Sequence, residues 1–336
     1  MTIAVVIPCY KVKKHILSVI ASIGAEVSLI YVVDDKCPEE SGKYVEAHCH
    51  DNRVRVVYNP ENRGVGGATM SGYRQAVEDN ADIVVKIDGD GQMNPKLIPR
   101  FVQPIIEGYA DYTKGNRFYS LESLEGMPRI RIIGNAGLSF LSKLTSGYWN
   151  IMDPTNGYTA IHSSVLRMLP LHKIDNRYFF ESDMLFRLNT FRAVVREVPM
   201  EAVYGEEKSN LNIIRVLKEF PRKHIVRFFK RIYYNYFLRD FNVCSVEIIS
   251  GAVLTTGGTI FGLIHWYLSI SRGIPATTGT VMLAALPVIL GFQLFLGAVH
   301  FDVMNIPKRP LHKFFGPNPP PPFPERAGGE KLTMPQ

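Results

Sequence analysis

Short apolar runs and segments with helical spacing alternate along the first two hundred residues of the chain. Four runs rich in β-branched side chains predict strands, at Thr2–Ile7, Ser28–Val33, Arg53–Tyr58 and Ile83–Ile87. Between them, apolar positions at helical spacing predict helices at Lys13–Ile23, Glu39–His50 and Gly66–Asn80. Strand–helix alternation of this kind predicts a mostly parallel sheet with helices on both faces, an α/β fold.

Two long apolar stretches follow in the C-terminal third. Ser245–Ile270 contains a single charged residue, Glu247, near its start, and Thr277–Val299 contains none. At about 1.5 Å per residue, each is long enough to cross a hydrocarbon core of about 30 Å. The short connection at 271–276 predicts a tight hairpin. The alternative is a pair of buried core helices, but a soluble core rarely needs two neighbouring stretches with so little charge.

The positive charge of the chain is concentrated just before this hairpin. The formal net charge is +7, and residues 211–240 hold eight Lys or Arg against two acidic residues. Apolar and aromatic residues interleave with these charges, which predicts amphipathic helices at an anionic membrane surface, interrupted at Pro221. An RNA-binding arm is the alternative, disfavoured because the segment runs directly into an apolar stretch.

Basic residues also predict the orientation of the hairpin. They flank its outer ends, whereas only Arg272 lies in the connecting loop. The positive-inside bias therefore predicts a multi-pass protein of the inner (cytoplasmic) membrane, with the N-terminal domain in the cytoplasm.

This patterning predicts four regions. They are an α/β domain at 1–210, amphipathic basic helices at 211–244, two transmembrane helices at 245–300 and a Pro-rich cytoplasmic tail at 301–336. The composition, 46% hydrophobic and 21% charged, is that of a globular protein. The four cysteines lack the spacing of a zinc site or disulfide framework, which favours a reducing compartment. The first apolar run is too short for the core of a signal peptide.

A possible metal site follows the fourth predicted strand. Asp88 and Asp90 flank a glycine, so both carboxylates are able to converge on one hard divalent cation, with Gln92 as a further oxygen ligand. A plain Asp-Gly turn is the alternative. A calcium loop of the EF-hand type is excluded, because Met93 and Pro99 stand where it needs Gly and Glu.

Two other strand ends carry residues that suit a nucleotide. The glycine-rich segment Asn62–Ala68 opens a predicted helix, where backbone N–H groups suit a phosphate; tight helix–sheet packing is the alternative. The pair Asp34 and Asp35 ends the second strand. These carboxylates either bind base and ribose or cap the next helix.

Further charged residues suit phosphate and acceptor binding. Arg117, Arg129 and Arg131 supply guanidinium groups for bidentate phosphate contacts, with surface solvation as the alternative. Glu181 and Asp183 follow aromatic residues at a predicted helix start. They either act as a base, position an acceptor, or simply complement the helix dipole.

Taken in order, these motifs resemble family 2 glycosyltransferases of the GT-A fold, within the polyprenyl-phosphate sugar synthase group. This group includes dolichyl-phosphate mannose synthase and bacterial undecaprenyl-phosphate glycosyltransferases. The motifs that carry the resemblance are Val5–Tyr10, Val32–Asp35, Asn62–Ala68, Asp88–Gln92, Gly115–Arg117 and Asp153–Tyr158. The chain departs from the family pattern at Lys11, where Asn is usual, and at Tyr204–Ser209, where many relatives carry Arg before Ser-Lys. It lacks the QxxRW element of the processive synthases.

The resemblance implies a metal-dependent, inverting transfer of a hexose-type sugar. The donor would be a UDP- or GDP-sugar, the acceptor polyprenyl (undecaprenyl) phosphate in the lipid bilayer, and the cofactor Mg²⁺ or Mn²⁺. Two alternatives are a membrane-bound glycosyltransferase acting on the hydroxyl of a lipid-linked saccharide, and a non-catalytic scaffold that binds nucleotide sugars. Small residues in the apolar stretches permit a homo-oligomer, and no nucleic-acid partner is expected.

The resemblance also implies roles for individual residues. The expected metal ligands are Asp88, Asp90 and Gln92. The expected catalytic residues are Asp90, Glu181, Asp183 and Arg117. The expected substrate contacts are Pro8, Tyr10, Asp34, Asp35, Asn62, Gly64, Gly66, Gly67, Lys86, Asp88, Arg129, Arg131, Asn156 and Lys208.

Overall fold

The computed structural model describes residues 1–119, 129–201 and 213–315; the side chains of 129–133 and 213–218 are outside this description. The chain forms two compact units. The first comprises Met1–His224 together with the segment that begins at Pro307, and the second comprises Ile225–Ile306.

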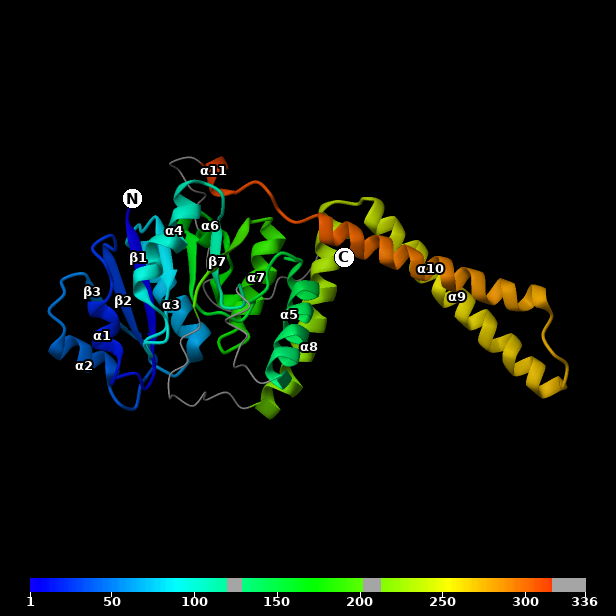
Figure 1. Cartoon of the computed structure of the whole chain (residues 1–336), viewed down its shortest axis with the longest axis horizontal. Coiled ribbons are helices and arrows are strands. Elements are labelled where there is room, and N and C mark those ends of the chain that lie inside the picture. Colours follow the sequence, from blue (N-terminus) through cyan, green and yellow to red (C-terminus); the bar gives the residue numbers. More distant parts are fainter. Residues whose placement is uncertain (120–128, 202–212, 316–336) are drawn as a thin grey trace, which may run out of the picture. The chain divides into compact units, whose positions relative to one another are not determined.

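The first unit contains one sheet and the helices that cover it (Figure 1). Its strands are β1 (Ile3–Cys9), β2 (Leu29–Asp34), β3 (Val54–Tyr58), β4 (Ile83–Lys86), β5 (Tyr112–Asn116), β6 (Thr159–His162) and β7 (Val195–Pro199). Its longer helices are α1 (Ile16–Ala21), α2 (Ser41–His48), α3 (Gly64–Glu78), α4 (Ile98–Ile106), α5 (Arg129–Ser146), α6 (Ser163–Met168) and α7 (Phe180–Phe191). Short elements are the 3₁₀ turns η1 (Pro95–Leu97) and η3 (Leu171–Lys173), and α11 (His312–Phe315). Helix α8 (Ile213–Tyr233) begins in this unit.

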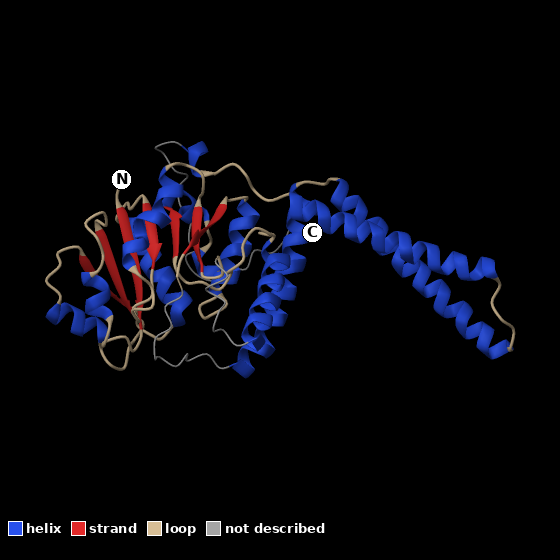
Figure 2. Cartoon of the chain, viewed as in Figure 1, coloured by secondary structure: helices blue, strands red, loops and turns tan. Residues whose placement is uncertain are grey.

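The seven strands form one mostly parallel sheet in the order β3-β2-β1-β4-β6-β5-β7 (Figure 2). Strand β6 runs antiparallel to both neighbours, β4 and β5, while the other pairs are parallel. The carboxyl ends of the parallel strands therefore lie at one edge, together with the amino end of β6. Ligands of such sheets bind at this edge.

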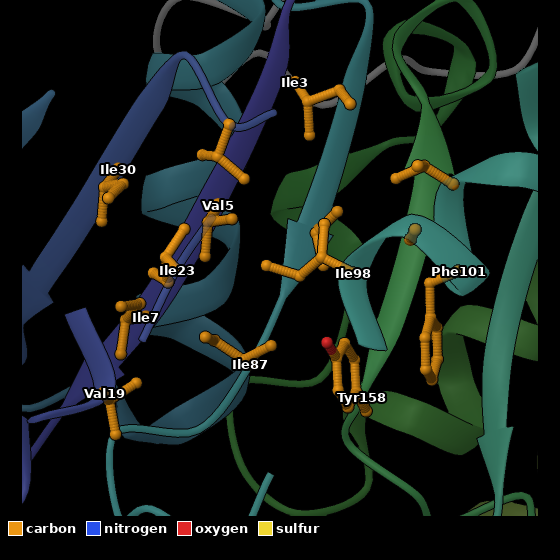
Figure 3. Close-up of a cluster of buried hydrophobic side chains, with 14 of the residues drawn as sticks. Ile3, Val5, Ile7, Val19, Ile23, Ile30, Ile87, Ile98, Phe101 and Tyr158 are labelled. Carbon is orange, nitrogen blue, oxygen red and sulfur yellow. The ribbon is translucent and has the colours of Figure 1, made fainter. Parts of the chain in front are cut away.

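The central, buried position of β1 explains why its sequence is almost entirely apolar. All seven of its residues are buried, because helices cover both faces of the sheet. Val5 and Ile7 pack with α1 and α4 in the cluster of Figure 3. Val6 points to the opposite face, where a Cβ on Gly72 of α3 would lie 2.4 Å from it. In the same cluster the rings of Phe101 and Tyr158 stack at 3.9 Å.

The strands and helices predicted from the periodicity are confirmed. Each of the four predicted strands lies within about two residues of β1 to β4, and the three predicted helices correspond to α1, α2 and α3. Helix α1 is shorter than predicted at both ends, because residues 13–15 form a turn in which the N–H of His15 donates to Val12 at 3.0 Å, and the helix ends at Ala21. Strands β5, β6 and β7 were not predicted, since their short segments mix polar and apolar residues.

The second unit contains the predicted hairpin. Its elements are the rest of α8, the π-helical segment η4 (Tyr234–Arg239), α9 (Val243–Arg272) and α10 (Thr278–Met304). Helices α9 and α10 are each long and apolar enough to cross a membrane. In the most apolar 18-residue stretch of each helix, only 11% is buried. Their apolar side chains are mostly exposed, unlike those of the core helices of a soluble protein. Small residues bring the two helices together: a Cβ on Gly251 would lie 3.0 Å from the carbonyl oxygen of Gly291.

Helix α8 corrects the predicted interruption at Pro221. The helix is continuous through this proline, although proline inside a helix removes one backbone hydrogen bond at a cost of about 3 kcal/mol. Residues on both sides of the proline make tertiary contacts that hold the helix in place. The rings of Phe220 and His224 pack edge-on against Phe179, and His224 bonds to Thr145 at 2.8 Å.

The second unit also holds a buried ion pair. Arg231 of α8 contacts both carboxylate oxygens of Asp302 in α10 at 2.6 and 3.0 Å, and Tyr236 donates to the same carboxylate at 2.5 Å. Arg231 is 1% exposed, so its charge depends on this partner.

Candidate active site

Four segments with polar or glycine-rich sequences meet at the carboxyl edge of the sheet. They follow β1, β2, β3 and β4, which lie side by side and run parallel. The segment Asp153–Gly157 joins them, because it precedes the antiparallel strand β6. This arrangement confirms that the predicted strand-end loops share one edge.

The loop after β4 carries the predicted metal ligands. One oxygen of Asp88 pairs with the buried Nζ of Lys86 at 2.7 Å, and Asp88 is 32% exposed. Asp90 accepts from the backbone N–H of Gln92 at 3.0 Å, and Gly91 turns the loop with a φ of 78°. No cluster of three or more His, Cys, Asp or Glu suited to a metal exists among the described residues. A site formed by two carboxylates and an amide, such as Mg²⁺ shares with substrate phosphates, therefore stays a prediction for this loop.

The acidic pair Asp34 and Asp35, at the end of β2, accepts hydrogen bonds from backbone N–H groups in this structure. Asp34 accepts from the N–H groups of Cys37 and Gly42, both at 2.7 Å, and so organises the start of α2. Asp35 accepts from the N–H groups of Arg63 and Gly64 at 2.9 and 2.7 Å. Asp34 thus makes a contact expected of a cap of the next helix, and Asp35 joins the start of α3; binding of base and ribose by this pair stays a prediction.

The glycine-rich start of α3 is packed against another loop. A Cβ on Gly66 would lie 2.4 Å from the carbonyl oxygen of Asp175, and the N–H of Gly67 donates to Asn176 at 2.9 Å. The N–H groups of Arg63 and Gly64 are already bound to Asp35. These glycines thus permit close packing, while exposed Asn62 lies at the rim.

Arg117, just after β5, forms a bidentate pair with a buried carboxylate. Its Nε and Nη2 donate to the two oxygens of Asp153 at 2.7 and 3.0 Å, and its backbone N–H donates at 3.2 Å. Asp153 is fully buried, whereas Arg117 is 33% exposed. Glu197 of β7 supports the same loop by accepting from the N–H of Asp153 at 2.8 Å. Burial raises the pKa of Glu197 above its ordinary value.

A row of buried polar residues crosses the sheet beside these loops. Lys86, Thr159 and Lys114 are direct partners in the register of β4, β6 and β5, so they share one face. Glu181 of α7 lies close enough to both lysines for their charges to interact with it. Burial raises the pKa of Glu181 to about 7, although both ammonium groups lower it. Burial lowers the pKa of Lys114 to about 8, opposed by Glu181 and Asp153.

The structure separates the two acidic residues of α7. Asp183 is fully buried and accepts from the N–H of Asp175 at 3.0 Å and from Arg187 at 3.4 Å. Asp183 therefore stabilises the loop before α7, whereas Glu181 lies near Lys86 and Lys114 of the buried polar row.

The remaining expected substrate contacts lie in different surroundings. Pro8 is buried in β1, and Tyr10 is 42% exposed at the rim. Asn156 is buried and donates to Asp153 at 3.3 Å. The side chains of Arg129 and Arg131, and the whole of Lys208, lie outside the described residues.

Sequence reasoning missed three residues of this edge: Lys114, Glu197 and the pairing role of Asp153. The one available signal was a lysine inside the polar but otherwise uncharged run Tyr112–Asn116, since a charged residue in a strand interior is rare unless paired.

The sequence of this chain is similar to those of known glycosyltransferases. The model of "Glycosyl transferase family 2" matches residues 4–169. The chain is 31% identical to a UDP-N-acetylglucosamine–dolichyl-phosphate N-acetylglucosaminyltransferase of Methanococcus voltae, covering 61% of this chain and 86% of the relative. It is 30% identical to an undecaprenyl-phosphate mannosyltransferase of Micrococcus luteus, covering 55% of this chain and 77% of the relative.

Among solved structures, the chain resembles glucosyl-3-phosphoglycerate synthase of Mycobacterium tuberculosis, crystallised with Mn²⁺ and UDP. The TM-score is 0.51 at 23% identity, covering 68% of this chain and 79% of that chain. This likeness concerns the fold, and it confirms the expected GT-A architecture.

Proposed function

Because this chain belongs to glycosyl transferase family 2, we propose that it transfers a sugar from a nucleotide diphosphate sugar to the phosphate of a polyprenyl lipid. One observation carries the proposal: the acidic loop at Asp88 and Asp90 shares a sheet edge with the cations Lys86, Lys114 and Arg117. Opposite charges at one edge suit a reaction between two phosphate-bearing substrates. The acceptors named for the Methanococcus and Micrococcus relatives, dolichyl phosphate and undecaprenyl phosphate, support the acceptor class.

Asp88, Asp90 and Gln92 would hold a divalent cation, Mg²⁺ or Mn²⁺, together with the donor diphosphate. Their donor set, two carboxylates and one amide on a single loop, fits such an ion. When bound, the ion neutralises the negative charge of the departing diphosphate.

In the proposed reaction, an oxygen of the lipid phosphate forms a bond to the anomeric carbon, and the bond from that carbon to the nucleoside diphosphate breaks. The electron pair of the broken bond leaves with the diphosphate, and the anomeric configuration inverts. A phosphate with a second pKa of about 6 is already ionised near neutral pH, so the reaction needs no strong base. Arg117, with Arg129 and Arg131, would bring the two anions together, and Glu181 would orient the acceptor.

The finer assignments extend this proposal. The sugar is of the hexose type, the acceptor is undecaprenyl phosphate, and the hairpin α9–α10 anchors the enzyme in the inner membrane with its N-terminal unit in the cytoplasm. The basic residues that flank the hairpin support this orientation. Exposed Trp266 and Tyr267, near the end of α9, suit the opposite membrane interface.

The test is a transfer assay on membranes that contain the full chain. Labelled UDP- and GDP-sugars are incubated with undecaprenyl phosphate and Mg²⁺ or Mn²⁺, and label entering the organic phase is counted. We expect transfer from one donor class and its loss on addition of EDTA. Asp90→Asn should abolish transfer without affecting membrane insertion.

The matched control is Asp51→Asn, because Asp51 pairs with Arg53 before β3, at the opposite edge of the sheet. This control should transfer sugar as the wild type does. Absence of lipid-linked label with every donor would overturn the proposed function, and full activity in EDTA or in Asp90→Asn would overturn the metal assignment.

A hydroxyl acceptor on a lipid-linked saccharide is the second candidate, favoured by one observation. Glu181 lies close enough to Lys86, Lys114 and Asp88 of the acidic loop for their charges to interact with it, and burial raises its pKa to about 7, a value that suits a general base near neutral pH. Loss of a general base lowers rates by about 10²- to 10⁴-fold, whereas loss of an orienting group costs less. A Glu181→Gln variant that loses more than about 10²-fold would therefore favour the hydroxyl acceptor.

A further inference from the structure

Lys114 is a fully buried lysine at the β5 end of the row Lys86–Thr159–Lys114, and the proposed reaction gives it no contact with either substrate. It lies in β5, two residues before Asn116 at the carboxyl edge of the sheet, and none of its side chain is exposed. Burying an ammonium group is unfavourable unless hydrogen bonds and nearby charges compensate for lost water. The contacts of its Nζ therefore indicate what the lysine does.

The Nζ of Lys114 donates to the backbone carbonyl oxygen of Asn156. Asn156 belongs to the loop Asp153–Gly157, and its side-chain amide donates to Asp153 at 3.3 Å. Asp153 in turn holds the guanidinium of Arg117 through two hydrogen bonds. A continuous chain of contacts thus runs from Lys114 to Arg117.

The backbone around this chain of contacts leaves little room for other arrangements. A Cβ on Gly115 would lie 2.7 Å from Nδ2 of Asn156, so glycine allows the loop to approach β5 closely. A Cβ on Gly157 would lie 2.5 Å from Nζ of Lys86. The loop is therefore clamped between two strands, with one buried ammonium group on each.

We infer that Lys114 is a positioning residue for the phosphate-binding Arg117, acting through the loop Asp153–Gly157. This inference rests on the proposed function for its kinetic consequence, but not for its structural one. Without the ammonium group, the carbonyl of Asn156 loses its donor and the loop gains freedom to move. Arg117 would then be oriented less well toward the phosphates.

The first experiment is a double-mutant cycle with Lys114→Met and Arg117→Lys in the transfer assay. We expect Lys114→Met to lower kcat/KM about tenfold in the wild-type background and less than twofold in the Arg117→Lys background, because residues acting as one unit are non-additive. A purely structural loss would multiply with the Arg117 effect. Where Lys114→Met gives little folded protein, Lys114→Gln replaces it in the same cycle.

The matched control is Thr113→Val, the neighbouring residue on β5. Thr113 is also fully buried and its hydroxyl also donates to a backbone carbonyl, that of Phe101 at 2.7 Å, but it points to the opposite face. Thr113→Val should lower thermal stability while keeping kcat/KM within twofold of the wild type. An equal kinetic loss in this control would contradict the inference.

The second experiment measures backbone hydrogen exchange, which needs no activity. In Lys114→Met, the amides of Asn156 and Tyr158 should exchange faster, while that of Tyr112 at the start of β5 should not. If the wild type transfers no sugar, the proposed function fails and hydrogen exchange still decides the positioning role. If the wild type is active but Lys114→Met has unchanged kinetics, or if its loop exchanges as in the wild type, the inference fails and the proposed function stands.

Discussion

Replacing Glu181 by glutamine should stabilise the first unit at neutral pH while lowering transfer. The pKa of this carboxyl rises from 4.5 to about 7, because burial disfavours the charged form more than Lys86 and Lys114 favour it. The folded state therefore holds a proton that the unfolded state has released between these two pH values. The free energy of unfolding falls as pH rises through this window.

The shift sets the expected magnitude. One pKa unit corresponds to about 1.4 kcal/mol, so ionised Glu181 lowers the free energy of unfolding by about 3 kcal/mol above pH 7. Glutamine resembles the protonated carboxyl in size and remains neutral. The variant should match the wild type near pH 4.5 and gain stability progressively up to pH 7. For a unit of this size, about 3 kcal/mol corresponds to a rise in Tm of about 6–12 °C.

The assay is thermal unfolding of the detergent-solubilised full chain at pH 5 and pH 8. Asp183→Asn, in the same helix, serves as the control and should lose stability at both pH values, because it weakens contacts with Asp175 and Arg187. A Tm difference between Glu181→Gln and wild type that is equal at pH 5 and pH 8 would refute the reasoning. So would a Gln variant less stable than wild type at pH 8.

Three other predictions follow from local geometry. Gly157→Ala should reduce kcat/KM about tenfold, because the new Cβ would lie 2.5 Å from Nζ of Lys86 and would displace that ammonium group. Gly137→Ala is the control and should retain full activity, because no atom lies within 4 Å of a Cβ at Gly137. His224→Leu should weaken the fall in Tm on acidification, because burial lowers the pKa of His224 from 6.5 to about 4. Each pH unit between 6.5 and about 4 therefore removes about 1.4 kcal/mol of stability, and an unchanged Tm–pH slope would contradict this. Asp302→Asn should destabilise the second unit by about 3 kcal/mol, because it removes the negative charge that pairs with the buried guanidinium of Arg231. Protease sensitivity of α10 measures the effect, and resistance equal to that of the wild type would count against it.

The position of the acidic loop at a strand end, and the two long helices of the hairpin, could be predicted because each follows from residues that are neighbours in the sequence. The apolar runs before Asp34 and Asp88 predicted buried parallel strands, and parallel strands place their carboxyl ends at one edge. The length and low charge of α9 and α10 likewise predicted a hairpin. The predicted break at Pro221 was wrong. The rule for proline considers only neighbours in the sequence, whereas Phe179, far away in the chain, packs against Phe220 and His224 on either side of the proline.

The hydrogen-bond or ion-pair partner of each polar group could not be predicted from the sequence. The amino-acid sequence specified that Asp34, Asp35 and the glycines of α3 follow strand ends. Only the folded chain decides that the two carboxylates accept from backbone N–H groups, and that the N–H of Gly67 donates to the carbonyl oxygen of Asn176. Only the pairing of β4, β6 and β5 brings Lys86 and Lys114, 28 positions apart, to either side of Thr159. Periodicity reports the environment of a residue along its own strand or helix, whereas hydrogen bonds and ion pairs depend on the register between strands, which is set by contacts far apart in the chain.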